Sequence, residues 1–159
     1  NDPVDLPWQD GLPASALQLE LSESALMREA QFSSQILQQL HSLGVLLAVD
    51  EFGTGYSSLS YLQSMAVDIL KIDRSFVTAI ETGAAAGSVT SHIIDMAKAL
   101  NLKIVAEGVE TEEQQQFLRQ HGVDFGQGWL FAKAMPALAF LAFCEKSRRT
   151  PVASAQRVA

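Results

Sequence analysis

The sequence predicts an α/β fold in which strand–helix units repeat. Short apolar runs, each of the length of one strand, alternate with stretches of helical periodicity. Polar side chains recur where these strands should end, namely Glu20, Asp50, Lys71, Glu107 and Gln127. In a (β/α) barrel the carboxyl ends of the strands form one rim, and recurrent acids at that rim can build a metal-dependent active site. One such acid carries little information, but several in phase indicate a site.

Composition limits the classes of function. The chain has 159 residues, 48% of them hydrophobic, which suits one domain or a large part of one. Its 11 basic and 18 acidic residues give a net charge of −7. This balance argues against broad electrostatic binding to nucleic acid or to an anionic membrane surface. An acidic protein that handles an anionic substrate needs metal ions between the two.

The single cysteine, Cys144, excludes a disulfide within the chain and a zinc cluster built from cysteines. This fits a reducing compartment, so we expect a cytoplasmic location and leave open a membrane tether in segments upstream. No stretch approaches the roughly 20 apolar residues of a membrane span. The chain starts at Asn1 rather than Met, and we expect it to be a fragment of a longer protein.

Five strands are expected from the apolar runs. They cover Leu17–Leu21, Val45–Asp50, Val67–Asp73, Lys103–Glu107 and Val123–Phe131, the last of them broken around Gly126–Gly128. The second run is continuously apolar up to its acid, as expected of a strand buried on both faces.

Helices are expected between these strands. From about 28 to 43 the apolar side chains fall on one helical face, and Gly44 is suited to end that helix. Residues 57–65 read as a short helix with a serine cap, and Ser75–Ile80 as a brief one. Glu81–Gly87 is rich in small residues and reads as a loop.

Three further helices are expected in the second half. Residues 88–100 show helical periodicity. The residues Thr-Glu-Glu-Gln at 111–114 have the spacing of a capping box, so a helix should run from 112 to 122. Pro136 suits the first turn of a final helix that ends near Ser147.

The count of strands predicts an incomplete barrel. A closed TIM-like (β/α) barrel needs eight strands and roughly 250 residues, whereas about five βα units are present here. We therefore expect residues 14–147 to be the C-terminal part of one domain, with about three strands lacking on the N-terminal side. Residues 1–13 read as a lead-in loop and 148–159 as a flexible tail.

Two strand ends carry unusual charge. Asp50 and Glu51 form an acid pair before a glycine-containing loop, which can hold cations or can be a plain turn with solvated acids. Lys71 lies between apolar residues, a costly position unless a carboxylate or phosphate pairs with it. It could orient a water or stabilise charge on a phosphoryl oxygen, or it could form an internal salt bridge, for example with Asp50.

Other acids come in strand and loop pairs. Glu20 and Glu107 lie on expected strands and are the better metal ligands, whereas Glu23 and Glu110 lie just beyond. Glu110 reads as an acid at a helix N-terminus. Gln127 could hydrogen-bond a water or substrate, but read alone it is a loop amide.

The remaining candidates read as structural. Trp129 and Phe131 are interpreted as core or pocket wall rather than a surface for base stacking, and Cys144 as a core residue of the last helix. The histidines are assigned to helix surfaces or helix ends; they are His41, His92 and His121.

Together these strings resemble the EAL domain family, the cyclic-di-GMP phosphodiesterases of bacterial signalling. The resemblance runs from about Leu12 to Pro136. It is carried by LELSES (Leu19–Ser24), DEFGTGYSSL (Asp50–Leu59), DILKIDRSFV (Asp68–Val77), VAEGVET (Val105–Thr111) and QGWLF (Gln127–Phe131). Several motifs in the correct order make the match specific.

The resemblance implies a barrel of the EAL type that hydrolyses cyclic-di-GMP to linear pGpG with two Mg²⁺ or Mn²⁺ ions. It implies as metal ligands Glu20, Asp50, Glu51 and Glu107. It gives catalytic roles, such as orienting the water, to Lys71, Glu107 and Gln127. Supporting acids are implied at Glu23, which braces the loop after Asp50, and at Asp73 and Glu110. The substrate loop is implied at Phe52, Gly53, Thr54 and Gly55.

The sequence departs from the family pattern twice. The usual acid pair is Asp-Asp, and here it is Asp50-Glu51, whose longer second side chain is expected to weaken activity. The Glu-Ala-Leu signature and the Asn-bearing strand upstream are also absent from these 159 residues.

Three hypotheses follow from the resemblance. In the first, the parent protein is a cyclic-di-GMP phosphodiesterase. In the second, it is a degenerate module that binds the dinucleotide or a protein partner without turnover. In the third, the isolated chain is inactive, because an open barrel exposes strand edges through which it aggregates or dimerises. The family further implies a homodimer through Phe52–Leu62 and an upstream GGDEF, PAS or receiver domain.

Overall fold

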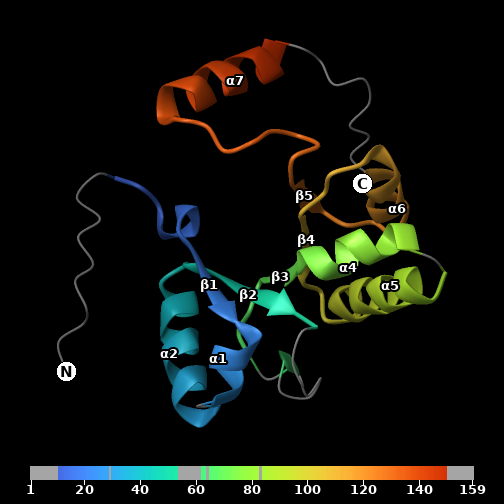
Figure 1. The fold of residues 1–159 in the computed structure, drawn as a ribbon. Helices are drawn as coiled ribbons and strands as arrows, with labels where there is room; N and C mark the ends of the chain where they lie inside the picture. Colours follow the sequence, from blue (N-terminus) through green and yellow to red (C-terminus); the bar gives the residue numbers. More distant parts are fainter. Residues whose placement is uncertain (1–10, 29, 54–61, 64, 83, 150–159) are drawn as a thin grey trace.

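One five-stranded sheet organises the chain. The structure is a computed structural model that describes residues 11–28, 30–53, 62–63, 65–82 and 84–149. The strands follow one another in the order β1-β2-β3-β4-β5, and each neighbouring pair is parallel (Figure 1). They are β1 (Gln18–Ser22), β2 (Leu46–Phe52), β3 (Ile69–Ile72), β4 (Lys103–Glu107) and β5 (Phe125–Gln127). All five predicted strands are confirmed, although β5 is much shorter than its apolar run.

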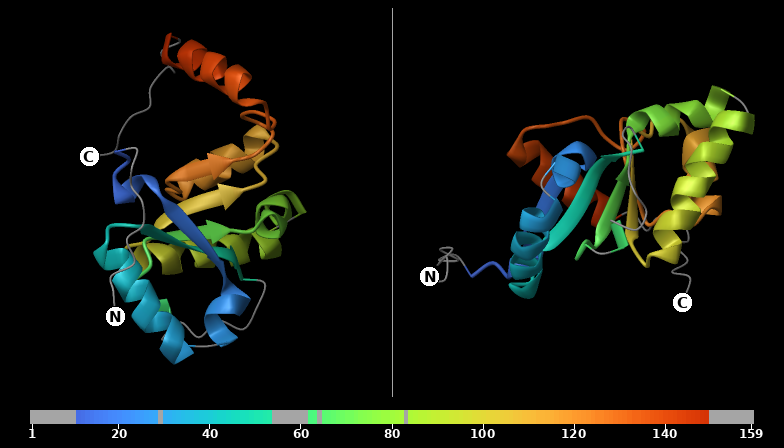
Figure 2. Two further views of the ribbon diagram at one scale, coloured as in Figure 1. Left: turned by 90° about the vertical axis from the view of Figure 1, so that its left-hand side faces the viewer. Right: turned by 90° about the horizontal axis from the view of Figure 1, so that it is seen from below.

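Helices connect the strands, as the α/β prediction requires. In chain order they are η1 (Ala14–Ala16), α1 (Glu23–Arg28), α2 (Ala30–Ser42), α4 (Arg74–Ala79), η2 (Ile80–Thr82), α5 (Ala84–Ala99), α6 (Glu112–Gln120) and α7 (Ala137–Arg149). Helix α2 lies beside β2 and α5 beside β4, whereas α7 stands apart from the sheet in both figures (Figures 1 and 2). Within the described residues, none of the helices combines the length and hydropathy needed to cross a membrane.

Two helix predictions were wrong in their boundaries. Helical structure begins at Glu23, directly after β1, where the Ser22 hydroxyl accepts a hydrogen bond from the Ala25 N–H. The expected loop at 81–87 is mostly helical, because α5 begins at Ala84 with residues of high helix propensity. The expected helix at 57–65 falls almost wholly outside the described residues, as does the tail beyond 149 and the lead-in before 11.

The core lies between the sheet and its helices. Strand β3 is buried at all four positions, and β2 is buried over its central residues. Fully or almost fully buried side chains come from both layers: Leu47, Leu70, Ile72, Ile94, Ile104 and Leu118. Each contributes about 1.5–3 kcal/mol relative to an exposed position. The apolar face of α2 is narrower than expected, since Leu37 is buried but Ile36 and Leu43 are exposed.

Two aspartates fix the amino ends of the strands. Asp68 precedes β3 and accepts a hydrogen bond from the backbone N–H of Leu47, while Asp124 precedes β5 and accepts one from Ile104. In both cases a carboxylate satisfies a backbone donor of a neighbouring strand. These bonds help to set the register that places the other ends of the strands side by side.

Helix α6 begins as its sequence predicts. The Thr111 side chain accepts a hydrogen bond from the Gln114 N–H, and the Gln114 side chain accepts one from the Thr111 N–H, which completes the capping box. The capping box therefore fixes the backbone where the segment after β4 enters α6.

The sheet has two open edges, and α7 leaves apolar side chains exposed. Within the described residues β1 and β5 each pair on one side only. The interpretation of Cys144 as a core residue is wrong, because it is only partly buried on a helix that does not pack into the core. Its large apolar neighbours are also exposed: Leu138, Phe140, Leu141 and Phe143.

Candidate active site at the carboxyl end of the sheet

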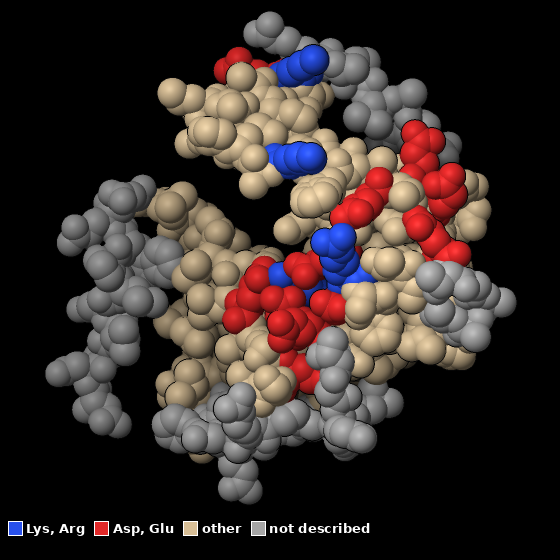
Figure 3. Space-filling model, in the orientation of Figure 1, with Lys and Arg blue, Asp and Glu red and all other residues tan. Residues whose placement is uncertain are grey.

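A buried lysine gathers three carboxylates at the ends of four neighbouring strands. The Nζ atom of Lys71 lies 2.7 Å from Glu20 Oε2, 2.7 Å from Glu107 Oε1 and 3.3 Å from Asp50 Oδ1. These side chains come from β1, β2, β3 and β4, and we call them the Lys71 cluster. Figure 3 shows Asp and Glu side chains gathered in the middle of one face, with Lys and Arg side chains among and beside them.

A bulge in β2 directs acids toward this point. Val49 pairs with Leu70 and Phe52 with Ile72, so Asp50 and Glu51 on β2 stand opposite Lys71 alone on β3. Glu51 takes a positive φ of 56°, which is uncommon for a residue other than glycine. Bulges re-aim side chains at the rims of barrels. Here the bulge turns Asp50 toward Lys71 and leaves the Glu51 side chain exposed.

The cluster stabilises the charge of Lys71. Burial alone would lower the pKa of this ammonium group, but hydrogen bonds to Glu107 and Glu20 and the charges of Glu107 and Asp50 outweigh it. The pKa is therefore raised well above its ordinary value, and Lys71 stays protonated. Three carboxylates around one ammonium group leave two negative charges uncompensated. The carboxylates retain partial contact with solvent, at 24–43% exposure, while the lysine side chain is 7% exposed.

The donor atoms suit hard divalent cations in kind. Carboxylate oxygens are the ligands that Mg²⁺ and Mn²⁺ prefer, and both glutamate oxygens lie 2.7 Å from the same nitrogen, so they are close neighbours. In the part of the chain that the structure describes, however, no three His, Cys, Asp or Glu side chains form a group that could hold a metal ion. The residues therefore fit such a cation by the kind of donor atom, while their present arrangement is that of ion pairs around Lys71.

Glu23 connects the cluster region to the segment after β2. Its side chain is 4% exposed, and Oε2 accepts a hydrogen bond of 2.9 Å from the Gly53 N–H. The contact holds the backbone at Gly53, directly after β2; that Glu23 braces the rest of the loop stays a prediction, because residues 54–61 lie outside the described part of the chain. The second oxygen, Oε1, is buried without a hydrogen-bond partner in the described part of the chain.

The other two supporting acids have local partners. Asp73 caps α4 and accepts hydrogen bonds from the backbone and side chain of Ser75, chiefly the side-chain bond, which lower the pKa of its carboxyl. Glu110, in the segment that leads into α6, forms a 2.8 Å ion pair with Arg74 at the start of α4. Within the described residues, the ion pairs of Lys71 include neither acid. Asp73 holds the backbone at the start of α4, and Glu110 links the segment after β4 to the Arg74 side chain.

Gln127 and the expected substrate loop at 52–55 lie near the ends of β5 and β2. Gln127 is exposed at the end of β5 and stands beside Glu107 in the strand register. The Phe52 side chain is buried in the core, whereas Gly53 is exposed. Thr54 and Gly55 lie outside the described residues. So does most of the expected dimer surface, of which Phe52 and Leu62 at its ends are buried.

The histidines lie on helices, as expected. His41 in the last turn of α2 contacts Asp68 at 3.1 Å, at the amino end of the sheet. His121 follows the last turn of α6 and stacks against Phe117. His92 lies within α5. None of the three is a member of the Lys71 cluster.

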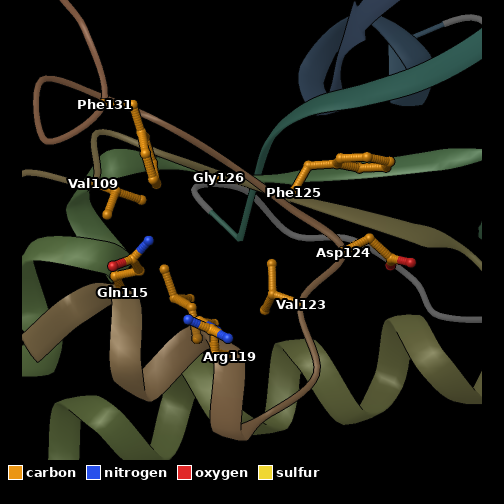
Figure 4. Close-up of a pocket in the computed structure, with 9 residues that line it drawn as sticks. Val109, Gln115, Arg119, Val123, Asp124, Phe125, Gly126 and Phe131 are labelled. Atoms are coloured by element: carbon orange, nitrogen blue, oxygen red, sulfur yellow. The ribbon is translucent and has the colours of Figure 1, made fainter. Parts of the chain in front are cut away.

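Two pockets lie near β5. One of about 570 Å³ adjoins the cluster; it includes Arg74, Gly108, Glu110, Gln127, Trp129 and Lys133 in its wall. Trp129 is thus a pocket residue, as one reading of the sequence allowed, while Arg74 and Lys133 carried no signal in the sequence. The other pocket, of about 300 Å³, lies between α6 and the loop after β5, with Arg119 on α6 and Phe131 on that loop (Figure 4).

Comparisons with known proteins agree with this architecture. Residues 5–134 match the EAL domain. The chain is 52% identical over 128 residues, 80% of its length, to the Probable cyclic di-GMP phosphodiesterase PdeB of Escherichia coli strain K12. The solved PaMucR phosphodiesterase in complex with c-di-GMP superposes with a TM-score of 0.80 at 45% identity, over 84% of this chain and 54% of that one. The solved complex of Klebsiella pneumoniae BlrP1 with manganese and cy-diGMP superposes with a TM-score of 0.71 at 31% identity, over 77% of this chain and 31% of that one.

The shared region is a part of longer proteins. The chain spans 24% of the length of PdeB and 17–18% of the next two curated relatives. Its five parallel strands correspond to part of the barrel in the solved structures, which agrees with the predicted fold class. Because the match covers most of the residues and includes the motifs at the strand ends, the chain belongs to the EAL domain family.

Proposed function

We propose that these residues form part of a domain that hydrolyses cyclic-di-GMP to linear pGpG, in a longer parent protein. The observation that carries the proposal is the Lys71 cluster at the carboxyl end of a parallel sheet. The similarity to phosphodiesterases, one of them solved with the dinucleotide, supports the choice of substrate.

In this proposal Glu20, Asp50 and Glu107 hold two Mg²⁺ or Mn²⁺ ions, with Glu51 as a further ligand. Bound there, the ions would polarise the phosphate and lower the pKa of an attacking water. The complex of BlrP1 with manganese supports this class of cofactor. The excess negative charge of the cluster favours binding of divalent cations.

In this proposal the remaining residues position the substrate and the attacking water, or stabilise the backbone that carries the ligands. Lys71 stays protonated and so presents a fixed positive charge to a phosphoryl oxygen or a water. Gln127, beside Glu107 in the sheet, presents an amide to the same region. Glu23 holds the backbone at Gly53, and thereby the bulge that aims Asp50.

The test is product formation by the full-length protein that carries these residues. With Mn²⁺ or Mg²⁺ we expect conversion of cyclic-di-GMP to pGpG, seen by chromatography, and none with EDTA. Glu107→Gln should abolish product, and Lys103→Met, a change in an exposed ion pair with Asp124, should not. Binding of the dinucleotide without any pGpG would contradict the proposal.

A second candidate is a module that binds cyclic-di-GMP or a protein partner without turnover. The observation in its favour is Glu51, exposed at a positive φ where the family has a shorter acid. Calorimetry that shows binding together with an absence of product would support this candidate. The expected homodimer through 52–62, a cytoplasmic location and an upstream signalling domain stay predictions.

A further inference from the structure

The segment after β4 determines where the Glu107 side chain lies. Glu107 is the last residue of β4, and its Oε1 atom lies 2.7 Å from Lys71 Nζ. Gly108 follows with a φ of 67°, and glycine adopts positive and negative φ about equally readily. Because the glycine does not fix the direction of the chain at this point, contacts from other elements have to fix it.

Backbone groups of this segment are held from two sides. Toward β5, the Val109 N–H donates a hydrogen bond of 3.0 Å to the Gln127 carbonyl. Toward α6, the N–H groups of Glu110 and Thr111 both donate to one atom, Gln114 Oε1. A side-chain amide oxygen has two lone pairs and can accept both bonds. Two consecutive backbone donors therefore converge on one glutamine.

The Gln114 side chain reaches further than a capping box requires. The capping box needs the bond to the cap residue Thr111, which is 3.2 Å long. The bond to the N–H of Glu110, one residue before the cap, is shorter, at 2.7 Å. Gln114 is only 3% exposed. Losing its amide would deprive two partly buried backbone donors of their acceptor, which is costly.

We propose that Gln114 is a positioning residue for the carboxylate of Glu107. Gln114 fixes the backbone at Glu110, and only two residues separate that point from Glu107, one of them bonded to β5. The glutamine thereby keeps the Glu107 carboxylate beside Lys71, among the acids that are proposed to hold divalent cations. The inference rests on the proposed function, because it names a residue that supports a ligand of the same site.

The test compares Gln114→Met with Gln114→Glu in the full-length protein. Methionine has a similar length but no amide, whereas glutamate keeps an acceptor oxygen and also suits a capping box. In Gln114→Met we expect faster hydrogen exchange of the backbone at 110–111, measured by mass spectrometry without metal. Gln114→Glu should restore the slow exchange of the wild type, because its carboxylate can accept the same two bonds.

Metal affinity and kinetics give the second readout. Residues that orient a metal ligand typically change metal affinity or activity by about 10–100-fold when they are replaced. Gln114→Met should therefore weaken Mn²⁺ binding, followed by electron paramagnetic resonance, and lower kcat, each by about tenfold or more. The KM for cyclic-di-GMP should stay close to that of the wild type, and Gln114→Glu should recover most of both losses.

Two controls separate positioning from stability. Gln116→Met makes the same change at an exposed position of α6 and should alter neither readout. Thr90→Val removes a buried hydroxyl of α5 that donates to the Phe76 carbonyl at 3.0 Å. It should lower the melting temperature but leave Mn²⁺ affinity and kcat unchanged at temperatures well below melting. If Gln114→Met does not fold, Gln114→Asn replaces it, because its shorter side chain cannot reach the N–H of Glu110.

The outcomes distinguish this inference from the proposed function. Normal kcat and Mn²⁺ affinity in folded Gln114→Met, or equal losses in Gln114→Met and Thr90→Val, would overturn the positioning role while hydrolysis by the wild type could still stand. Mn²⁺ binding that depends on Gln114, without any pGpG from the wild type, would keep the positioning role and remove the hydrolysis. A wild type that neither binds Mn²⁺ nor forms product would remove both.

Discussion

Replacing Lys71 by methionine tests whether this one ammonium group holds three strand ends together. The substitution keeps an apolar stem of similar length and removes the charge. Hydrogen bonds to charged partners contribute about 1.5–3 kcal/mol each when buried, and Lys71 makes two such bonds, at 2.7 Å. The carboxylates are 24–43% exposed, so solvent screening reduces these values.

From this geometry we expect Lys71→Met to lower the free energy of unfolding by about 2–4 kcal/mol in EDTA. For a chain of this size that corresponds to a fall in the melting temperature of roughly 4–16 °C. Because the variant cluster carries one more uncompensated negative charge, Mn²⁺ should raise the melting temperature of the variant by more than that of the wild type. Hydrolysis by the full-length variant should be lost.

The assay is thermal unfolding followed by circular dichroism, with EDTA and with Mn²⁺. Lys103→Met is the control, because its ion pair with Asp124 has the same 2.7 Å length but involves a lysine that is 66% exposed. It should cost less than about 1 kcal/mol. If both variants melt together with the wild type in EDTA, the account of Lys71 as the centre of the site is refuted.

Three further changes probe the surroundings. Asp73→Ala removes the cap of α4 and should lower the free energy of unfolding by about 1 kcal/mol. Hydrogen bonds from Ser75 lower the pKa of Asp73 in the folded state, so the stabilisation by this carboxylate is fully present above the ordinary pKa of 3.8 and is lost as the pH falls through the lowered pKa. Denaturation measured between pH 2 and 6 would show this loss. Glu51→Asp restores the shorter acid at a backbone position that Asp tolerates, and should raise turnover of the full-length protein; a decrease would contradict the geometric argument. Gly53→Ala should lower the melting temperature by several degrees, because φ at this position is 95° and an added Cβ would lie 2.7 Å from the ring of Phe76. Gly87→Ala should not lower the melting temperature, because a Cβ there would make ordinary contacts within α5.

Much of the fold could be predicted from the sequence because its signals are local. Continuous apolar runs identified β2 and β3, and the residues at 111–114 identified the start of α6. The acids and the lysine at strand ends could be expected to meet, since parallel strands align their carboxyl ends. That expectation agrees with the ion pairs of Lys71 to three of them.

Other features depend on contacts that no local pattern encodes. The bulge at Asp50–Glu51 exists because β2 and β3 slip by one residue against each other. Arg74 is distant from Trp129 in sequence, and only folding brings the two side chains together. The last helix read as a core element, yet its apolar side chains are exposed, because amphipathic pattern predicts a helix but not the partner that covers it.

The sequence by itself determined the family, the repeating α/β pattern and the acids at the strand ends, because hydrophobic period and short motifs are properties of consecutive residues. Only the tertiary structure decided that Lys71 is shared by Glu20, Asp50 and Glu107, and that Arg74, Glu110, Trp129 and Lys133 line one pocket near the end of β5. Distances between side chains on different strands follow from register and packing, which the whole chain sets together.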